Sequence, residues 1–151
     1  MLNELDFSAV IVTIKLALVS TVILILIGTP IAWWLSQTKL KFKAVFEAII
    51  ALPLILPPTV LGFYLLITLG SNGPIGRLLE SIGGSSIAFT FSGLVVGSVI
   101  YSMPFVVQPL QNSFSSVGRK PLEVAATLGA SKIDCFFSVA VPLARSGFIT
   151  A

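Results

Sequence analysis

Residues 123–129 and Pro142 form the most specific pattern of polar and small residues in the chain, with Pro142 thirteen residues after Gly129. Glu123 falls where the first turn of a helix leaves N–H groups free, a place that favours a carboxylate, and Gly129 suits the left-handed turn that ends a helix. Ala125 and Ala126 leave a small, low-profile face. The pattern predicts a short helix, and the plain alternative is an ordinary amphipathic helix that re-enters the membrane.

The residues after Gly129 predict a second short helix. Ser131 and Asp134 stand three apart, as in a helix-capping pair, and mainly apolar residues follow. Pro142 is then expected to redirect the chain toward the next segment. Residues 115–147 therefore should hold two short helices joined by a tight turn rather than a disordered linker.

The inventory of reactive side chains argues against an enzyme. The chain has no histidine, a single cysteine (Cys135), no phosphate-binding glycine loop ending in Lys-Ser or Lys-Thr, and no carboxylate pair in a plausible pocket. Without histidine the commonest metal ligand is missing. We therefore expect no catalytic residue, no bound cofactor and no metal site, and we interpret Cys135 as an inert, small apolar residue.

The elements that must position these residues are membrane helices. The chain is 56% hydrophobic and only 10% charged, which is far outside the range of soluble domains. Residues 16–38, 48–76 and 81–118 carry no charge, and each stretch exceeds the roughly 20 residues that cross the hydrocarbon. We predict an all-α, polytopic bundle as one domain over 1–151, with spans at about 10–35, 45–69 and 87–110. A fourth span begins near Phe148 and is apparently truncated by the chain end.

The basic residues predict the orientation of the spans, because lysine and arginine are retained on the cytoplasmic side. They gather between the first two predicted spans and after the third. These residues are Lys39, Lys41, Lys43, Arg119, Lys120, Lys132 and Arg145. The opposite side has Arg77 and the acidic start of the chain, Glu4 and Asp6. The amino terminus is therefore expected outside and residues 115–147 in the cytoplasm, and the net charge of +3 reflects topology, not nucleic-acid binding.

Prolines interrupt the predicted spans, most densely in the second. Each proline removes a backbone donor and kinks its helix, which is tolerated where water or neighbouring groups satisfy the freed carbonyls. Pro57, Pro58 and Thr59 in the second span are therefore candidates for a pathway lining, with plain helix packing as the alternative. Gly93 and Gly97 form a pair of small residues for close helix packing in the third span.

Between the second and third spans, the sequence predicts a short helix that starts at Pro74 and is ended by Gly83 and Gly84. Its apolar residues recur at helical spacing and make one stripe. They are Ile75, Leu78, Leu79 and Ile82. Arg77 and Glu80 occupy the other face, so the helix is expected to lie in the membrane interface, with docking of an external partner as the alternative.

Residues 123–142 resemble the cytoplasmic signature of the membrane-spanning permease subunits of binding-protein-dependent ABC importers. That signature reads Glu-Ala-Ala, three residues, Gly, nine residues, Ile, one residue, Leu-Pro. Glu123, Ala125, Gly129 and Pro142 match it, and the departures conserve size and polarity. The departures are Val124 for the first alanine, Val139 for the isoleucine and Val141 for the leucine.

The resemblance implies a coupling helix that sits in a groove of a separate cytoplasmic ATPase. Glu123, Ala125 and Ala126 would then shape the ATPase contact, Gly129 would supply the turn, and Pro142 would set the return into the membrane. The other implied partners are a second permease copy, an external substrate-binding protein and the bilayer of a bacterial cytoplasmic membrane. ATP would be bound and hydrolysed by the partner subunit.

The stretch Leu52–Gly62 further resembles molybdate permeases, as do residues 70–76 and 88–93. A desolvated oxyanion in hydrocarbon is prohibitively costly, so the resemblance implies a hydrated cavity between two copies, with selectivity resting on the external binding protein. Candidate pathway hydroxyls are Thr59, Ser98 and Ser102. The alternatives are a permease for tungstate, sulfate, thiosulfate or another small solute, and a channel or secondary transporter. A channel or secondary transporter usually places ionisable groups inside the membrane, and only Lys15, near the end of a predicted span, approaches such a position.

Overall fold

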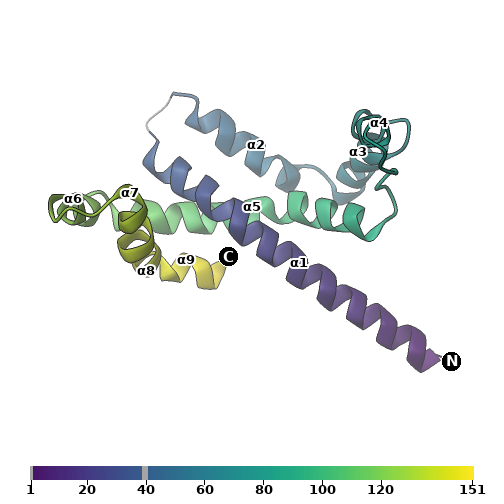
Figure 1. Ribbon diagram of the computed structural model, residues 1–151, viewed down its shortest axis with the longest axis horizontal. Coiled ribbons are helices and arrows are strands. Elements are labelled where there is room, and N and C mark those ends of the chain that lie inside the picture. Colours follow the sequence, from purple (N-terminus) through teal and green to yellow (C-terminus); the bar gives the residue numbers. More distant parts are fainter. Residues whose placement is uncertain (1, 39–40) are drawn as a thin grey trace. The chain divides into compact units, whose positions relative to one another are not determined.

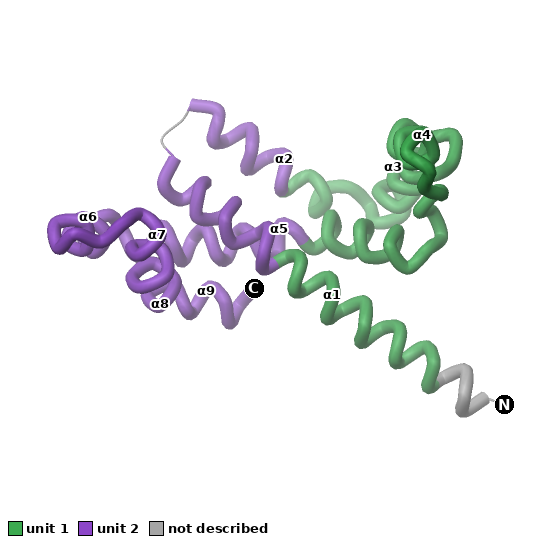
Figure 2. Tube along the Cα trace, viewed as in Figure 1, with its two compact units in different colours: residues 1–24, 51–102 green, residues 25–50, 103–151 purple. Residues whose placement is uncertain are grey.

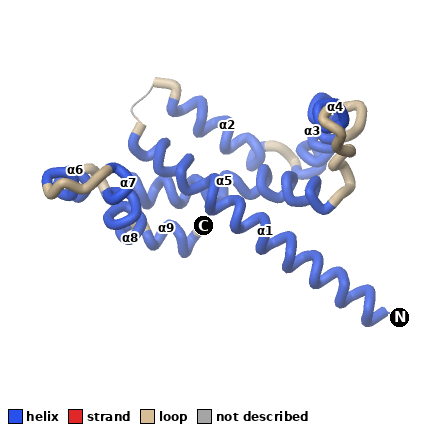
Figure 3. Tube along the Cα trace, viewed as in Figure 1, coloured by secondary structure: helices blue, strands red, loops and turns tan. Residues whose placement is uncertain are grey.

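The computed structural model describes residues 2–38 and 41–151, with side chains from residue 7 onward. Within these residues the chain is built of helices joined by short turns (Figures 1 and 3). The charges of Glu4, Asp6 and Lys39, used above to predict orientation, lie outside the described side chains. The helices, in chain order, are α1 (Leu2–Gln37), α2 (Lys43–Ile55), α3 (Pro58–Leu69), α4 (Pro74–Ser81), α5 (Phe91–Val117), α6 (Lys120–Thr127), α7 (Lys132–Asp134), the π-helix η1 (Cys135–Ala140), α8 (Val141–Leu143) and α9 (Arg145–Thr150).

Two of the described helices are long and apolar enough to cross a membrane, Phe7–Gln37 within α1 and Phe91–Val117, which is α5. A third candidate is the pair Lys43–Ile55 and Pro58–Ser81, which is bent by 107°. The predicted class, an all-α membrane protein, is confirmed. The number of crossings and the side that the amino terminus faces stay predictions.

The second predicted span is not one kinked helix over 45–69. Pro58 has no backbone N–H and its ring excludes the helical conformation from the residue before it. Accordingly Pro57 is extended, with φ −55° and ψ 138°, and α2 and α3 are separate helices. Pro53, by contrast, is buried inside α2 without ending it.

The third predicted span, 87–110, also has different ends. Helix α5 begins at Phe91, after the Thr90 hydroxyl has accepted a hydrogen bond from the backbone N–H of Gly93 at 3.2 Å. It ends at Val117, before Gly118 with φ +71°, so residues 115–117 belong to this helix and not to the segment after it. Apolarity marks the bilayer and not the helix, which is why the helix ends differ from those of the predicted span, and the bounds of the crossing stay a prediction.

The chain divides into two compact units (Figure 2). Unit 1 holds residues 1–24 and 51–102, and unit 2 holds 25–50 and 103–151, so α1, α2 and α5 each contribute a segment to both. In unit 1, α3 faces α5 where a Cβ on Gly97 would stand 3.6 Å from Leu65 Cδ1. Gly62 of α3, by contrast, has open space around it.

Unit 2 is built around the second half of α1 and the second half of α5. A Cβ on Gly28 would stand 3.1 Å from Val106 Cγ1, so the two helices approach closely there. Leu35, Val107 and Leu110 are almost fully buried in this unit. Many other large apolar side chains are exposed, Leu26 at 69% among them, as expected of helices that face lipid rather than water.

Helix α4 packs against the end of α3 through small residues. The backbone N–H of Gly73 donates to the Gly70 carbonyl at 2.8 Å, and a side chain on Gly76 would overlap that same carbonyl oxygen. At the far end, Gly83 with φ +83° donates to Glu80, and Gly84 donates to Leu79 at 2.8 Å, which is the Schellman arrangement. The predicted glycine stop of this helix is confirmed.

Gly76→Ala is therefore expected to destabilise the fold, because backbone and not a flexible side chain occupies the space of the new methyl group. Overpacking of this kind costs about 1–3 kcal/mol. Thermal unfolding in detergent should show a lower midpoint for Gly76→Ala and no such loss for Gly62→Ala, the control in open space. Equal midpoints for the two variants would contradict this account of α4.

Candidate functional site

Helix α6 presents Glu123 at its start. Pro121 lies in its first turn, and the Glu123 backbone N–H donates to the Arg119 carbonyl at 2.9 Å. No described residue of α6 is buried, and the Glu123 and Ala126 side chains are both exposed. The helix is thus a projecting element whose own residues supply little core.

Gly129 ends α6 in the left-handed conformation, with φ +88°. Its backbone N–H donates to the Ala126 carbonyl at 3.0 Å, and the N–H of Ala130 donates to the Ala125 carbonyl at 3.1 Å. This is again a Schellman turn, which satisfies carbonyls that the helix end would leave free. The turn leaves Leu128 83% exposed, an apolar side chain at the tip of the segment.

Ser131 and Asp134 form the predicted capping box. The Ser131 hydroxyl donates to Asp134 Oδ2 at 2.7 Å, the Ser131 backbone N–H donates to the same oxygen at 3.1 Å, and the Asp134 N–H donates to the Ser131 hydroxyl at 3.2 Å. Hydrogen bonds from the Ser131 side chain, and then from its backbone, lower the pKa of the Asp134 carboxyl. The ionised form of Asp134 therefore holds the start of the second short helix.

The second short helix takes a form that the sequence did not predict. After α7 it continues as the π-helix η1, and the Val141 N–H donates to the Phe136 carbonyl five residues back. Pro142 lies in the first turn of α8, where the missing N–H of a proline is harmless. The helical path is interrupted two residues later, at Ala144, with φ −88° and ψ 12°, and the role of Pro142 in the return of the chain stays a prediction.

An aromatic cluster joins these short helices to the long ones within unit 2. The Trp33 ring of α1 meets Phe114 of α5 and Phe136 of η1 edge to face, with centroids 5.3 Å apart in both pairs. Phe114 is fully buried and also meets Phe148 of α9 at 6.0 Å. The cluster therefore packs the segment after α5 against α1 and α5 within unit 2.

Beside this cluster lies a hollow of about 470 Å³. Both charged and apolar side chains line it. Arg119 Nη2 donates to the Gln37 carbonyl at 3.3 Å, and this hydrogen bond links the start of α6 to the end of α1. The buried thiol of Cys135 lies within hydrogen-bonding reach of two backbone carbonyls, as befits a structural residue. The lining is Trp33, Gln37, Arg119, Leu122, Glu123, Ala126, Ala130, Lys132 and Cys135.

Sequence reasoning brought Glu123, Ala126 and Cys135 to notice but missed Trp33 and Gln37 in this hollow. Both stand at the end of the first predicted span, where an aromatic residue beside a polar one is ordinary, so only the fold could show their proximity to α6. Within residues 2–38 and 41–151 no three potential metal ligands among Cys, Asp and Glu come together.

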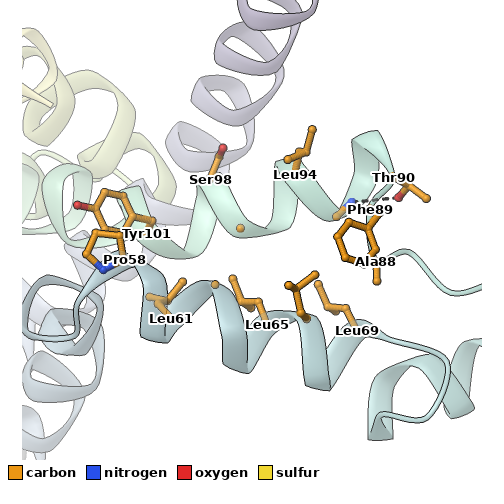
Figure 4. A pocket seen from close by; sticks show the side chains of 14 residues that line it. Pro58, Leu61, Leu65, Leu69, Ala88, Phe89, Thr90, Leu94, Ser98 and Tyr101 are labelled. Atoms are coloured by element: carbon orange, nitrogen blue, oxygen red, sulfur yellow. Dashed lines mark hydrogen bonds between the residues drawn. The ribbon is translucent and has the colours of Figure 1, made fainter.

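Of the predicted pathway residues, Pro58 and Ser98 line one hollow of about 620 Å³ in unit 1, between α3 and α5 (Figure 4). Pro57, Thr59 and Ser102 do not line it. Figure 4 shows Leu61, Leu65 and Leu69 of α3 pointing toward α5. A wall of this kind suits apolar contacts better than a hydrated anion, and the roles of the hydroxyl groups stay predictions.

Residues 20–151 match the family described as "Binding-protein-dependent transport system inner membrane component". The chain is similar to the molybdenum transport system permease protein ModB of Azotobacter vinelandii, with 59% identity over 99% of this chain and 66% of the relative. Proteins of the same name from Haemophilus influenzae (32% identity, 96% of this chain, 63% of the relative) and Escherichia coli K12 (31%, 98%, 65%) are also similar. The chain thus spans about two thirds of the length of these curated relatives.

Removing the Phe136 ring should loosen the short helices from α1 and α5. Phe136→Ala is expected to cost about 2–4 kcal/mol of stability, somewhat less than a fully buried ring, and to raise hydrogen exchange across residues 120–143. Phe137→Ala removes an identical ring that is 65% exposed and serves as the matched control. Equal exchange in the two variants would show that the cluster does not hold the segment.

The capping box should make the start of α7 sensitive to acid. Because the pKa of Asp134 is lowered in the folded state, its stabilising contribution is present above the unfolded pKa and is lost as pH falls through the folded pKa. The protection of the amides at residues 132–135, measured as exchange relative to the intrinsic rate at each pH, should therefore fall on acidification, and Asp134→Asn should abolish that dependence. A titration of Asp134 that is identical in Ser131→Ala and the native protein would contradict the assignment.

Proposed function

The chain belongs to the family of binding-protein-dependent transport system inner membrane components, and from this premise we propose that it is the membrane-spanning permease of an ATP-driven molybdate importer. The substrate follows from the relatives that are named molybdenum transport system permeases. The observation that carries the mechanism is the projecting α6, tied to α1 and α5 through the aromatic cluster and the Arg119–Gln37 hydrogen bond.

In this proposal α6 is the coupling helix. It docks into a separate cytoplasmic ATPase through its exposed Glu123, the small side chains of Ala125 and Ala126, and the turn at Gly129. Leu128 at the tip supplies an apolar contact. The segment that follows, through Pro142, carries the movement back to the long helices. ATP is bound and hydrolysed on the partner, and this chain holds neither cofactor nor metal.

Two copies of the permease, with the amino terminus outside the bacterial cytoplasmic membrane, enclose the pathway. Because burying a bare dianion in hydrocarbon is prohibitive, the anion crosses hydrated in a cavity that opens to one side at a time. An external binding protein supplies molybdate and most of the selectivity. The apolar hollow of unit 1 is then a packing surface of the permease rather than the anion's route.

Uptake in vesicles tests this function. The intact permease, reconstituted with its ATPase and its molybdate-binding protein, is expected to accumulate radiolabelled molybdate only with ATP, with tungstate competing and sulfate not. Accumulation without ATP would contradict an ATP-driven importer, and ATP-dependent uptake of another solute alone would overturn the substrate.

Glu123→Lys should uncouple the two activities. We expect normal membrane insertion and continued ATP hydrolysis, with molybdate uptake reduced at least tenfold, because the reversed charge stands at the docking face. Glu80→Lys makes the same change on the exposed face of α4 and is the control. Normal molybdate uptake by the Glu123→Lys variant would contradict the assignment of α6 as the coupling helix.

A further inference from the structure

Four large apolar side chains stand exposed on α4 and the loop that leads from it to α5. They are Ile75 (41% exposed), Leu78 (64%), Ile82 (75%) and Phe89 (90%), and we call them the α4 patch. Their exposure is not explained by packing within unit 1, where α4 turns a different face inward.

The inward face of α4 is made of glycine. Gly73 and Gly76 are buried, and both approach the backbone at the end of α3. On a helix, Ile75, Leu78 and Ile82 fall on the side away from Gly76. The patch is therefore directed away from the contact that holds α4 in place.

The segment that bears the patch is fixed at the end of a membrane helix. Only residues 70–73 separate α3 from α4, and they are closed by the Gly73–Gly70 hydrogen bond. The loop before α5 is held at the same point, since the Ser86 hydroxyl donates to the Leu69 carbonyl at 3.0 Å. The last turns of α3 also expose Leu66 and Ile67, so α4 follows directly on an apolar, exposed stretch of the third candidate span.

Phe89 adds an independent observation. It is the non-glycine residue of the described chain with a positive φ, +59°, a conformation that costs an L-residue free energy. It is one of the residues that line the hollow between α3 and α5, beside Thr90 at the start of α5 (Figure 4), and 90% of its surface is exposed. A strained backbone that held an almost fully exposed ring in water would gain nothing, whereas a ring inserted into an apolar phase offsets the strain.

We propose that the α4 patch lies in the boundary between headgroups and acyl chains of the phospholipid bilayer, with α4 parallel to the membrane surface. Arg77 and Glu80, both exposed, then point to the aqueous side. A lipid surface fits better than a protein partner because the short turn at residues 70–73 holds α4 at the end of α3, which belongs to the third candidate span. The two opposite charges also give α4 no net charge with which to attract a partner.

Spin labels at neighbouring positions test this directly in the protein reconstituted in phosphatidylcholine and phosphatidylglycerol vesicles. The label is placed at Leu78→Cys or Phe89→Cys on the patch and at Arg77→Cys as the matched control on the other face. Native Cys135 is buried, and the unsubstituted protein gives the labelling background. Accessibility to oxygen, which concentrates in lipid, is compared with accessibility to a water-soluble nickel chelate.

We expect the ratio of oxygen to nickel accessibility to be high at residues 78 and 89 and to reverse at residue 77. Nickel accessibility at residues 78 and 89 equal to that at 77 would place the patch in water and overturn the proposal. Protection of 78 and 89 from both reagents would overturn it too, because a protein partner or a second copy would then cover the patch. Two patch positions keep the test valid if one substitution disturbs folding.

Discussion

The contact of Trp33, Phe114 and Phe136 is the interaction on which the rest of unit 2 depends. Edge-to-face aromatic pairs contribute about 0.5–1.5 kcal/mol each beyond their buried area, and Trp33 makes two of them, at 5.3 Å. Helix α6 has no buried residue among those described and could not hold its position by its own packing. The cluster packs the segment that follows α6 against the long helices, as the proposed coupling role of α6 requires.

The bilayer supplies the second constraint, because every backbone polar group inside it needs a partner. Helices α1 and α5 meet this demand without interruption, although Pro30, Pro104 and Pro109 lie inside them. Pro57 and Pro58 together do not allow it, and the bend between α2 and α3 follows. Such a break is costly in lipid, and in unit 1 it leaves α3 free to face α5 across an apolar hollow.

The sequence predicted best what depends on a few neighbouring residues. Gly129, the Ser131–Asp134 capping box and the glycine end of α4 all follow from local chemistry, and each was found as expected. The π-helix was missed because apolar periodicity does not report a single extra residue in a turn. Trp33 and Gln37 were missed because their meeting with the segment after α5 is a tertiary contact about a hundred residues away in the chain, which no local pattern encodes.

The central claim, that α6 docks into the ATPase, is tested most directly by photo-cross-linking in the assembled transporter. A benzophenone amino acid at Leu128, 83% exposed at the tip of the segment, is compared with the same group at Ile82, 75% exposed on the other short helix. The account predicts a covalent product with the ATPase from residue 128 and none from residue 82. Absence of that product at 128, or its appearance at both positions, would contradict it.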